Sequence, residues 1–208
     1  MIVVHHLENS RSQRILWLLE ELALDYEVKR YERDKVTMLA PPELRAVHPL
    51  GKSPVIEHDG HVLIETAAIA EYLVEIGGGR LGPPKDRDAA LRYRQFMHYA
   101  EGSAMPPLVI KLVLGRIPLF GGRAQKRIQP MIDSHLRWLE GELAQREWFA
   151  GPDMTAADIM MSFPLEAARS RAGLTPETYP NLSAFLDRVH ARPAYQAALA
   201  RGGPYAYA

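Results

Sequence analysis

The sequence predicts two domains of different class: an α/β domain over residues 1–77 and an all-helical domain over residues 88–208, with a linker over 78–87. Three observations support this division. Short β-branched runs alternate with helical stripes through the first 76 residues, and no strand alternation follows residue 86. Between them, GGGRLGPPK at 77–85 continues neither a helix nor a strand. A chain of 208 residues is long enough for two small domains.

The first domain begins with a β-branched run at 2–7, which ends at a turn and predicts a largely buried strand. A helix is expected over 11–22, because Ile15, Leu18, Leu19 and Leu22 form an i, i+3, i+4, i+7 stripe. Leu16 and Trp17 lie off that stripe and predict a second buried side, which we expect to face the C-terminal domain. Residues 26–31 predict the second strand.

A short helix is expected to start at residues 41–44, followed by a hairpin of strands 54–57 and 62–64 around Asp59-Gly60, a strong hairpin signal. The next helix, over 66–76, should bury Ile69, Leu73 and Ile76. The order βαβ followed by αββα is that of a thioredoxin-like domain.

The second domain contains only helical patterns. They cover 88–102, 107–114, 123–145, 156–171, 181–191 and a short stretch after residue 193. Thr155 and Asp158 have the spacing of a capping box, in which each side chain binds the other residue's backbone N–H. We assign this pair to the folding of the helical domain, without a chemical role.

Composition excludes several functions. Lys+Arg and Asp+Glu both number 25, so no net field favours nucleic acid or an anionic membrane, and we expect no nucleic-acid partner. The chain has no cysteine, which removes disulfides, thiolate metal ligands and a CxxC redox pair. His5 and His6 point to opposite faces of a strand and cannot grip one ion, so no metal is expected.

Location follows from two absences in the sequence. No run approaches the roughly 20 apolar residues of a membrane helix, and MIVVHHLENS lacks a basic region followed by a long apolar one. We expect a cytoplasmic protein without a membrane span.

The stretch HPLGKSPVI at 48–56, followed by Glu65-Thr66 at the head of a helix, predicts a ligand site. A cis peptide at Ser53-Pro54 would leave the Ser53 backbone free to pair with a peptide-like ligand. Glu65 and Thr66 would place backbone N–H groups and a hydroxyl at a helix N-terminus, where a carboxylate is stabilised. Together these features predict a site for a small anionic peptide.

These residues resemble the glutathione-binding half of glutathione S-transferases. The likeness covers nearly the whole chain: SRSQRILWLLEELALDYEV, APPELRAVHPLGKSPVIE, EGSAMPPL and TAADIMMSFPL are similar, in order, to the yeast-type branch of that family. The resemblance implies glutathione as co-substrate, a small hydrophobic electrophile as second substrate, and a homodimer. It also implies that such an enzyme can reduce organic hydroperoxides.

The resemblance places the catalytic serine four residues before an arginine of the first helix, here Arg14, and so selects Ser10. An unperturbed thiol titrates near 8.5, and a hydrogen-bond donor beside a helix N-terminus favours the thiolate. Ser12, two residues further, is the alternative. Without the family, SRSQ at 10–13 is a capping box of the first helix, and the cap then falls to Ser12 if Ser10 is catalytic.

Other site residues follow from the same resemblance. Ser53, Pro54, Glu65 and Thr66 would hold glutathione, with Lys52 and His48 near its glycine carboxylate. An equally good interpretation of Lys52 is a solvated loop lysine, and His48 is more simply a turn histidine. Glu101 would approach the γ-glutamyl amine across a dimer interface, although an ordinary surface carboxylate is the simpler interpretation.

The electrophile site is expected between the domains, near Asn9, Arg11, Tyr99, Met105 and Leu108, although such aromatic and methionine residues are more often core. Two other functions remain open. One is a non-catalytic adaptor that keeps the fold; the other is a glutathione-dependent isomerase. The isomerases resemble SSxSxR in the first turn, from which NSRSQR at 9–14 departs at its first serine.

Overall fold

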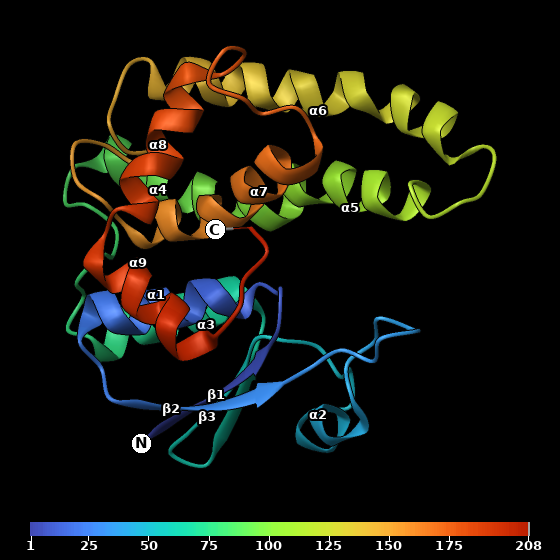
Figure 1. The fold of residues 1–208 in the computed structure, drawn as a ribbon. Helices are drawn as coiled ribbons and strands as arrows, with labels where there is room; N and C mark the ends of the chain where they lie inside the picture. The colour runs from blue at the N-terminus through green and yellow to red at the C-terminus, as the bar shows by residue number, and fades with distance from the viewer. Residues whose placement is uncertain (208) are drawn as a thin grey trace. The chain divides into compact units, whose positions relative to one another are not determined.

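The computed structural model describes residues 1–207. The chain divides into two compact units (Figure 1). The first contains residues 1–82 and 190–206, and the second contains residues 83–189 with Tyr207. The break after Gly82 falls inside the predicted linker. The predicted helical domain of 88–208 differs from the structure at its end, because residues 190–206 group with the first unit.

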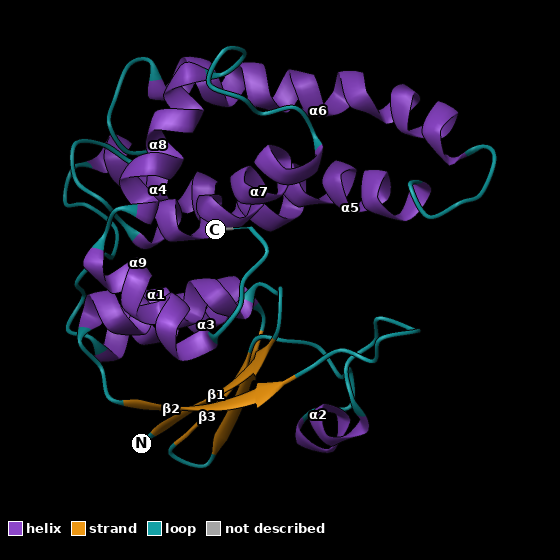
Figure 2. Ribbon diagram, in the orientation of Figure 1, coloured by secondary structure: helices purple, strands orange, loops and turns teal. Residues whose placement is uncertain are grey.

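The first unit holds a four-stranded sheet in the order β2-β1-β3-β4 (Figure 2). Its strands are β1 (Ile2–Leu7), β2 (Tyr26–Tyr31), β3 (Val55–His58) and β4 (His61–Ile64). β1 runs parallel to β2 and antiparallel to β3, with Val4 opposite Val28 on one side and Ile56 on the other. The predicted turn joins β3 to β4, with Asp59 and Gly60 both at positive φ. This sheet and its helix order confirm the thioredoxin-like prediction.

Four helices belong to this unit: α1 (Ser12–Leu22), α2 (Pro42–Val47), α3 (Thr66–Ile76) and α9 (Pro193–Gly202). Ile69 and Leu73 of α3 are buried as expected. Ile76 is exposed, contrary to the prediction, because it lies in the last turn and the glycines that follow it have no side chains to cover it.

The second buried side of α1 is covered by α9. Leu16 and Trp17 are fully buried, and the Trp17 ring meets the edge of Tyr195 with 5.4 Å between centroids. Arg192 makes two hydrogen bonds to the Glu21 carboxylate, at 2.5 and 2.9 Å, and this partner raises the pKa of Arg192. The C-terminal helix therefore packs on α1 as part of the first unit, which corrects the predicted domain limit.

The second unit is helical, as predicted. Its elements are α4 (Arg87–Tyr99), the π-helical turn η1 (Ala100–Ala104), α5 (Met105–Leu114), α6 (Gly121–Leu143), α7 (Ala156–Arg171) and α8 (Pro180–His190). α7 is buried over most of its length. The rings of Phe96, Phe149 and Phe185 pack in series, with centroids 4.7 and 5.1 Å apart, and form an aromatic centre in this core.

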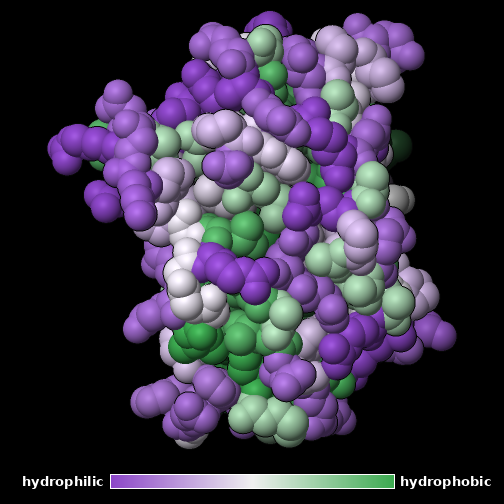
Figure 3. Space-filling model, turned by 90° about the vertical axis from the view of Figure 1, so that its left-hand side faces the viewer, coloured by the Kyte–Doolittle hydropathy of each residue, from purple (hydrophilic) through white to green (hydrophobic). Residues whose placement is uncertain are grey.

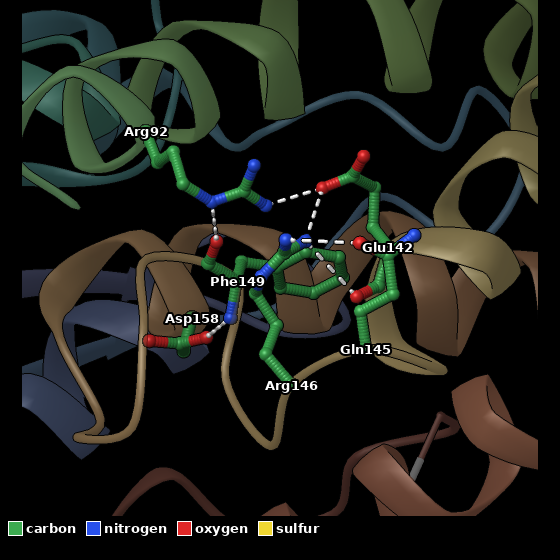
Figure 4. A network of polar contacts seen from close by, with 6 residues as sticks. All are labelled: Arg92, Glu142, Gln145, Arg146, Phe149 and Asp158. Atoms are coloured by element: carbon green, nitrogen blue, oxygen red, sulfur yellow. Dashed lines mark hydrogen bonds and ion pairs between the residues drawn. The ribbon is translucent and has the colours of Figure 1, made fainter. Parts of the chain in front are cut away.

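The start of α7 carries the predicted capping box. Asp158 is fully buried, and its carboxylate accepts hydrogen bonds from the Thr155 N–H at 2.8 Å and the Thr155 hydroxyl at 3.0 Å. It also accepts one from the Phe149 N–H at 2.8 Å, while Arg92 binds the Phe149 carbonyl at 3.1 Å (Figure 4). Both backbone groups of Phe149 are thus fixed, and the predicted capping box is confirmed.

Arg92 continues this network by pairing with Glu142, which Arg146 also binds at 2.7 Å (Figure 4). Burial raises the pKa of Asp158 to about 6, against the lowering effect of its hydrogen-bond donors. Figure 3 shows hydrophilic groups over much of one face of the molecule, with apolar groups gathered in clusters between them. None of the helices within residues 1–207 is long and apolar enough to cross a membrane.

Candidate functional site

Two serines at the end of β1 form a buried hydrogen-bond chain with His6. The hydroxyl oxygens of Ser10 and Ser12 lie 2.8 Å apart, and the Ser12 hydroxyl lies 2.8 Å from Nδ1 of His6. Ser10 is 6% exposed, whereas Ser12 is fully buried behind it. Of the two candidates for thiol activation, Ser10 is therefore the more accessible.

The other ring nitrogen of His6 sets the direction of this chain. A hydrogen bond from the ring to the backbone of Gly202 raises the pKa of His6, and only a carbonyl acceptor has this effect. Burial and the charge of Arg30 outweigh it and lower the pKa to about 4, so the ring is neutral near neutral pH. With Nε2–H donating to Gly202, Nδ1 accepts the Ser12 proton, and Ser12 in turn accepts from Ser10.

The capping box predicted for SRSQ is only half formed, because Ser10 makes a capping contact while the side-chain amide of Gln13 makes no hydrogen bond within residues 1–207. The N-cap residue is Arg11, and Ser12 is the first helical residue. Ser10 accepts a hydrogen bond from the Ser12 N–H at 3.3 Å, which is the usual bond from a capping side chain to the second residue after it. The two hydroxyls also form the chain to His6.

The depressed pKa of His6 predicts an acid-sensitive first unit. In the unfolded chain the ring binds a proton near pH 6.5, but in the folded state only near 4, so stability is lost as the pH falls between these values. We expect His6 to account for a loss of about 2 kcal/mol between about pH 6 and 4.5. His6→Asn keeps an acceptor for Ser12, and it should not show this loss of stability at low pH.

The measurement is urea unfolding across this pH range, with the slope of stability against pH compared between wild type and His6→Asn. His61→Asn is the matched control, because His61 is an exposed histidine of the same sheet. Parallel slopes for wild type and His6→Asn would contradict the assignment.

The predicted peptide-binding turn reaches the same end of β1. Ser53-Pro54 is a cis peptide, as expected. The Ser53 hydroxyl donates to the His5 carbonyl at 2.8 Å and accepts from the Leu7 N–H at 3.2 Å. Ser12 approaches the carbonyl of that same Leu7 at 3.4 Å. The structure thus brings the serine pair and the turn to one residue of β1.

The first backbone N–H groups of α3 have no hydrogen-bond partners within residues 1–207. Its N-cap, Glu65, makes no side-chain cap and has a positive φ of 69°, which is uncommon outside glycine. The first intrahelical bond runs from the Ile69 N–H to the Glu65 carbonyl, so the N–H groups of Thr66 and its two successors are left over. Thr66 is buried. This helix end favours an anionic group.

The side chains of Lys52 and His48 differ in how available they are to a ligand. Lys52 is exposed, and its ammonium group has no partner among residues 1–207, so it can meet a carboxylate. His48 is half-buried, and its Nδ1 accepts a hydrogen bond from the Leu50 N–H at 3.4 Å, which stabilises the turn. His48 therefore fits the turn interpretation better.

The predicted electrophile residues lie in different units. Asn9 and Arg11 belong to the first, where the Asn9 side-chain oxygen accepts from the Ala206 N–H at 2.7 Å. In the second, the Tyr99 hydroxyl binds His135, and burial raises its pKa. The other candidates of that unit, Met105 and Leu108, are buried. Their role in an electrophile site stays a prediction.

Glu101 lies in η1, within a helical path that widens to a π-turn over Ala100–Ala104. Such turns are frequent at functional sites. Glu101 is half-buried, and it has interactions within the chain. Its proposed approach to a ligand of a second subunit stays a prediction.

Sequence reasoning did not identify His6 or the C-terminal segment as parts of this site. His6 gave no signal beyond a strand histidine, and its function depends on a carbonyl of Gly202, almost 200 residues away. A side chain at Gly202 would also meet Gln13 at 2.7 Å, which shows how closely this segment approaches α1. Within residues 1–207, no group of three or more metal-binding side chains is present.

Comparison with known families matches both parts of the chain. Residues 1–75 match the family described as "Glutathione S-transferase, N-terminal domain", and residues 108–193 match "Glutathione S-transferase, C-terminal domain". The first match contains the serine chain, the Ser53-Pro54 turn and the start of α3.

Relatives cover the chain nearly end to end. Glutathione S-transferase 3 of Schizosaccharomyces pombe is 40% identical, over 93% of this chain and 85% of its own length. Glutathione S-transferase 1 of Saccharomyces cerevisiae is 32% identical, over 95% and 93%. A solved glutathione S-transferase from Actinobacillus pleuropneumoniae superposes with a TM-score of 0.88 at 33% identity, covering all of this chain and 95% of its own. The chain belongs to the glutathione S-transferase family of enzymes, on its yeast-type branch.

Proposed function

We propose that this enzyme binds glutathione in its first unit and activates the thiol for attack on hydrophobic electrophiles. The observation that carries the proposal is the convergence on Leu7, whose N–H contacts Ser53 and whose carbonyl contacts Ser12. The peptide turn and the thiol-activating serines thus share one anchor. The uncapped start of α3 adds donors for the γ-glutamyl carboxylate, and Lys52 adds a cation for the glycine carboxylate.

We assign thiol activation to Ser10 rather than Ser12. The Ser12 hydroxyl has one proton and already two acceptors within reach, Nδ1 of His6 at 2.8 Å and the Leu7 carbonyl at 3.4 Å, so Ser12 cannot donate to a thiolate without losing such a bond. Ser10 is not restricted in this way, because its hydroxyl can rotate from Ser12 to a thiolate while Ser12 keeps its bond to His6. A hydrogen bond to the charged form lowers the thiol pKa.

His6 does not serve as the base at the end of this chain. A proton passed from the thiol through both serines would reach a ring with a pKa of about 4, against about 8.5 for the thiol. That gap opposes the transfer by about 6 kcal/mol. The chain therefore orients the serines, and the proton leaves the thiol to solvent.

The thiolate then attacks an electrophilic carbon, forming a carbon–sulfur bond as the leaving group departs with its electron pair. Reduction of an organic hydroperoxide by the same thiolate is a second activity that we propose. The hydrophobic electrophile is proposed to contact Asn9, Arg11, Tyr99, Met105 and Leu108. Cytoplasmic location is part of the same proposal.

An adaptor without catalysis is the competing function, and the presence of Ser10, Ser53, Pro54, Glu65 and Thr66 disfavours it. The isomerase alternative is disfavoured by Asn9, whose side chain holds the Ala206 N–H where the isomerase motif has a serine.

The direct experiment measures glutathione binding and turnover together. Saturating glutathione should raise the melting temperature, because a ligand specific to the folded state stabilises it. A panel of model electrophiles and hydroperoxides should then give glutathione-dependent turnover. Binding without any turnover would favour the adaptor, and an unchanged melting temperature would contradict the glutathione site itself.

Thr66 provides a binding prediction. Thr66→Ala removes a buried hydroxyl at the start of α3, and we expect glutathione to bind roughly 10-fold more weakly, as for one lost hydrogen bond to a charged group. Isothermal titration calorimetry measures this change. Thr178→Ala is the control, since Thr178 is an exposed threonine with hydrogen bonds of its own in the second unit. Equal affinity in Thr66→Ala and wild type would remove Thr66 from the site.

Oligomeric state is a separate prediction. We propose a twofold homodimer, which is the commonest closed arrangement of identical chains. Light scattering should give twice the chain mass of 23.4 kDa. In that dimer Glu101 is proposed to approach the partner's glutathione, so Glu101→Gln should weaken binding. A mass near that of one chain at assay concentration would rule out both statements.

A further inference from the structure

The turn between α5 and α6 concentrates positive charge in a chain that is neutral as a whole. Between Glu101 and Asp133 there is no acidic residue, but there are five basic ones. The rest of the chain therefore holds 20 of the 25 basic side chains and all 25 acidic ones. The overall balance of charge conceals this segregation, and the composition argument above missed it.

Four of these cations surround the turn. Arg116 precedes it, and Arg123, Lys126 and Arg127 occupy the first two turns of α6. The side chains of all four are exposed, and none of these side chains has a hydrogen bond or ion pair with any of residues 1–207. We call these four residues the basic collar. Unpaired cations of this kind are available to an anionic surface.

The apex between them is apolar. Leu119 is 97% exposed and Phe120 is 69% exposed, while Ile117 beside them is 46% exposed. Figure 1 shows this turn at the free end of α5 and α6, beyond α7 of the same unit. Exposed side chains of this size at a protruding end form a convex apolar tip rather than a groove.

We propose that the α5–α6 tip is a docking element for anionic phospholipid bilayers, in which Leu119 and Phe120 enter the interface and the basic collar binds the headgroups. The dimensions agree with this arrangement. The headgroup region is about 5–8 Å thick on each side, and Lys126 and Arg127 lie about 8–9 Å along α6 from its start, given a rise of 1.5 Å per residue. The collar thus stands at headgroup level when the apex reaches the acyl boundary.

A bilayer fits these observations better than a folded partner does. A convex tip needs a concave acidic pocket on a protein, whereas a fluid interface adapts to it. Apolar anchors combined with a cationic rim are the two signals that peripheral membrane binding requires together, since one alone gives weak attachment. Nothing in this inference depends on the proposed chemistry of the first unit.

The experiment is co-sedimentation of the full-length protein with vesicles. Binding is expected to vesicles of phosphatidylcholine mixed with phosphatidylglycerol, to fall with added salt, and to be weak for phosphatidylcholine alone. Leu119→Ser with Phe120→Ser should weaken binding roughly 10-fold or more. Neutralising Arg123, Lys126 and Arg127 to Gln should weaken it by roughly five-fold per charge. Phe120→Trp should show a blue-shifted emission with the anionic vesicles.

Matched controls change equivalent residues elsewhere. Val36→Ser removes a highly exposed apolar side chain, and Lys85→Gln with Arg87→Gln and Arg94→Gln removes the same charge. Retained binding in both controls, with loss in both tip variants, supports the proposal. Equal binding to both vesicle types, or equal loss in the controls, overturns it. A lower light-scattering mass for the tip variants also overturns it, because a second copy of the chain would then cover the tip.

Discussion

Ser10→Ala should raise the pKa of the bound glutathione thiol and lower turnover at neutral pH by up to roughly 100-fold, the loss expected for one preorganised donor. The reason is that Ser10 is the accessible end of a chain whose inner member is committed to His6. Stability should fall by about 1 kcal/mol, because Ser10 also accepts the Ser12 N–H at the start of α1. The thiolate absorbance of the bound ligand, titrated against pH, measures the effect directly.

Ser12→Ala is the matched control in the same chain. It removes the acceptor that competes with the thiolate for the Ser10 proton, so the thiol pKa should stay the same or fall. It should also destabilise the first unit, since it leaves Nδ1 of the buried His6 without its donor. A thiol pKa raised in Ser12→Ala but unmoved in Ser10→Ala would transfer the catalytic function to Ser12.

Local patterns were sufficient to predict most of the fold. Each strand of the sheet and each long helix lies within a few residues of its expected place, because periodicity, the Asp59-Gly60 turn and the Thr155–Asp158 box act over a few residues. The cis peptide at Ser53-Pro54 could be predicted for the same reason, because the residues of the turn itself indicate it.

What could not be predicted depends on long-range contacts. The sequence shows that Leu16 and Trp17 need a partner, but it does not show that α9 supplies it. For the same reason the His6 ring could be read only as a strand residue, since its tautomer is set by Gly202. The capping box assigned to SRSQ is only half formed, because Ser10 accepts the Ser12 N–H but the Gln13 side chain does not reach back to Ser10.

The second large effect is expected at Asp158, on stability rather than on turnover. Asp158→Ala leaves the N–H of Phe149, the N–H of Thr155 and the Thr155 hydroxyl without their acceptor in a fully buried site. Since each unsatisfied buried group costs about 1–3 kcal/mol, we expect a loss of about 4 kcal/mol. Asp158→Asn should lose about half of that, because its amide oxygen still accepts but its NH₂ faces a donor.

Urea unfolding followed by tryptophan fluorescence at about pH 8 measures this loss, two units above the pKa of about 6, where the carboxylate is charged. Asp86→Ala is the control, because Asp86 caps α4 through a single bond to the Ala89 N–H at 2.9 Å and is exposed. That variant should lose only about 1 kcal/mol. If Asp158→Ala lost no more than Asp86→Ala, the fixed backbone of Phe149 would not be a main support of the helical unit. Glutathione binding per folded molecule should stay unchanged in both, since neither residue belongs to the first unit.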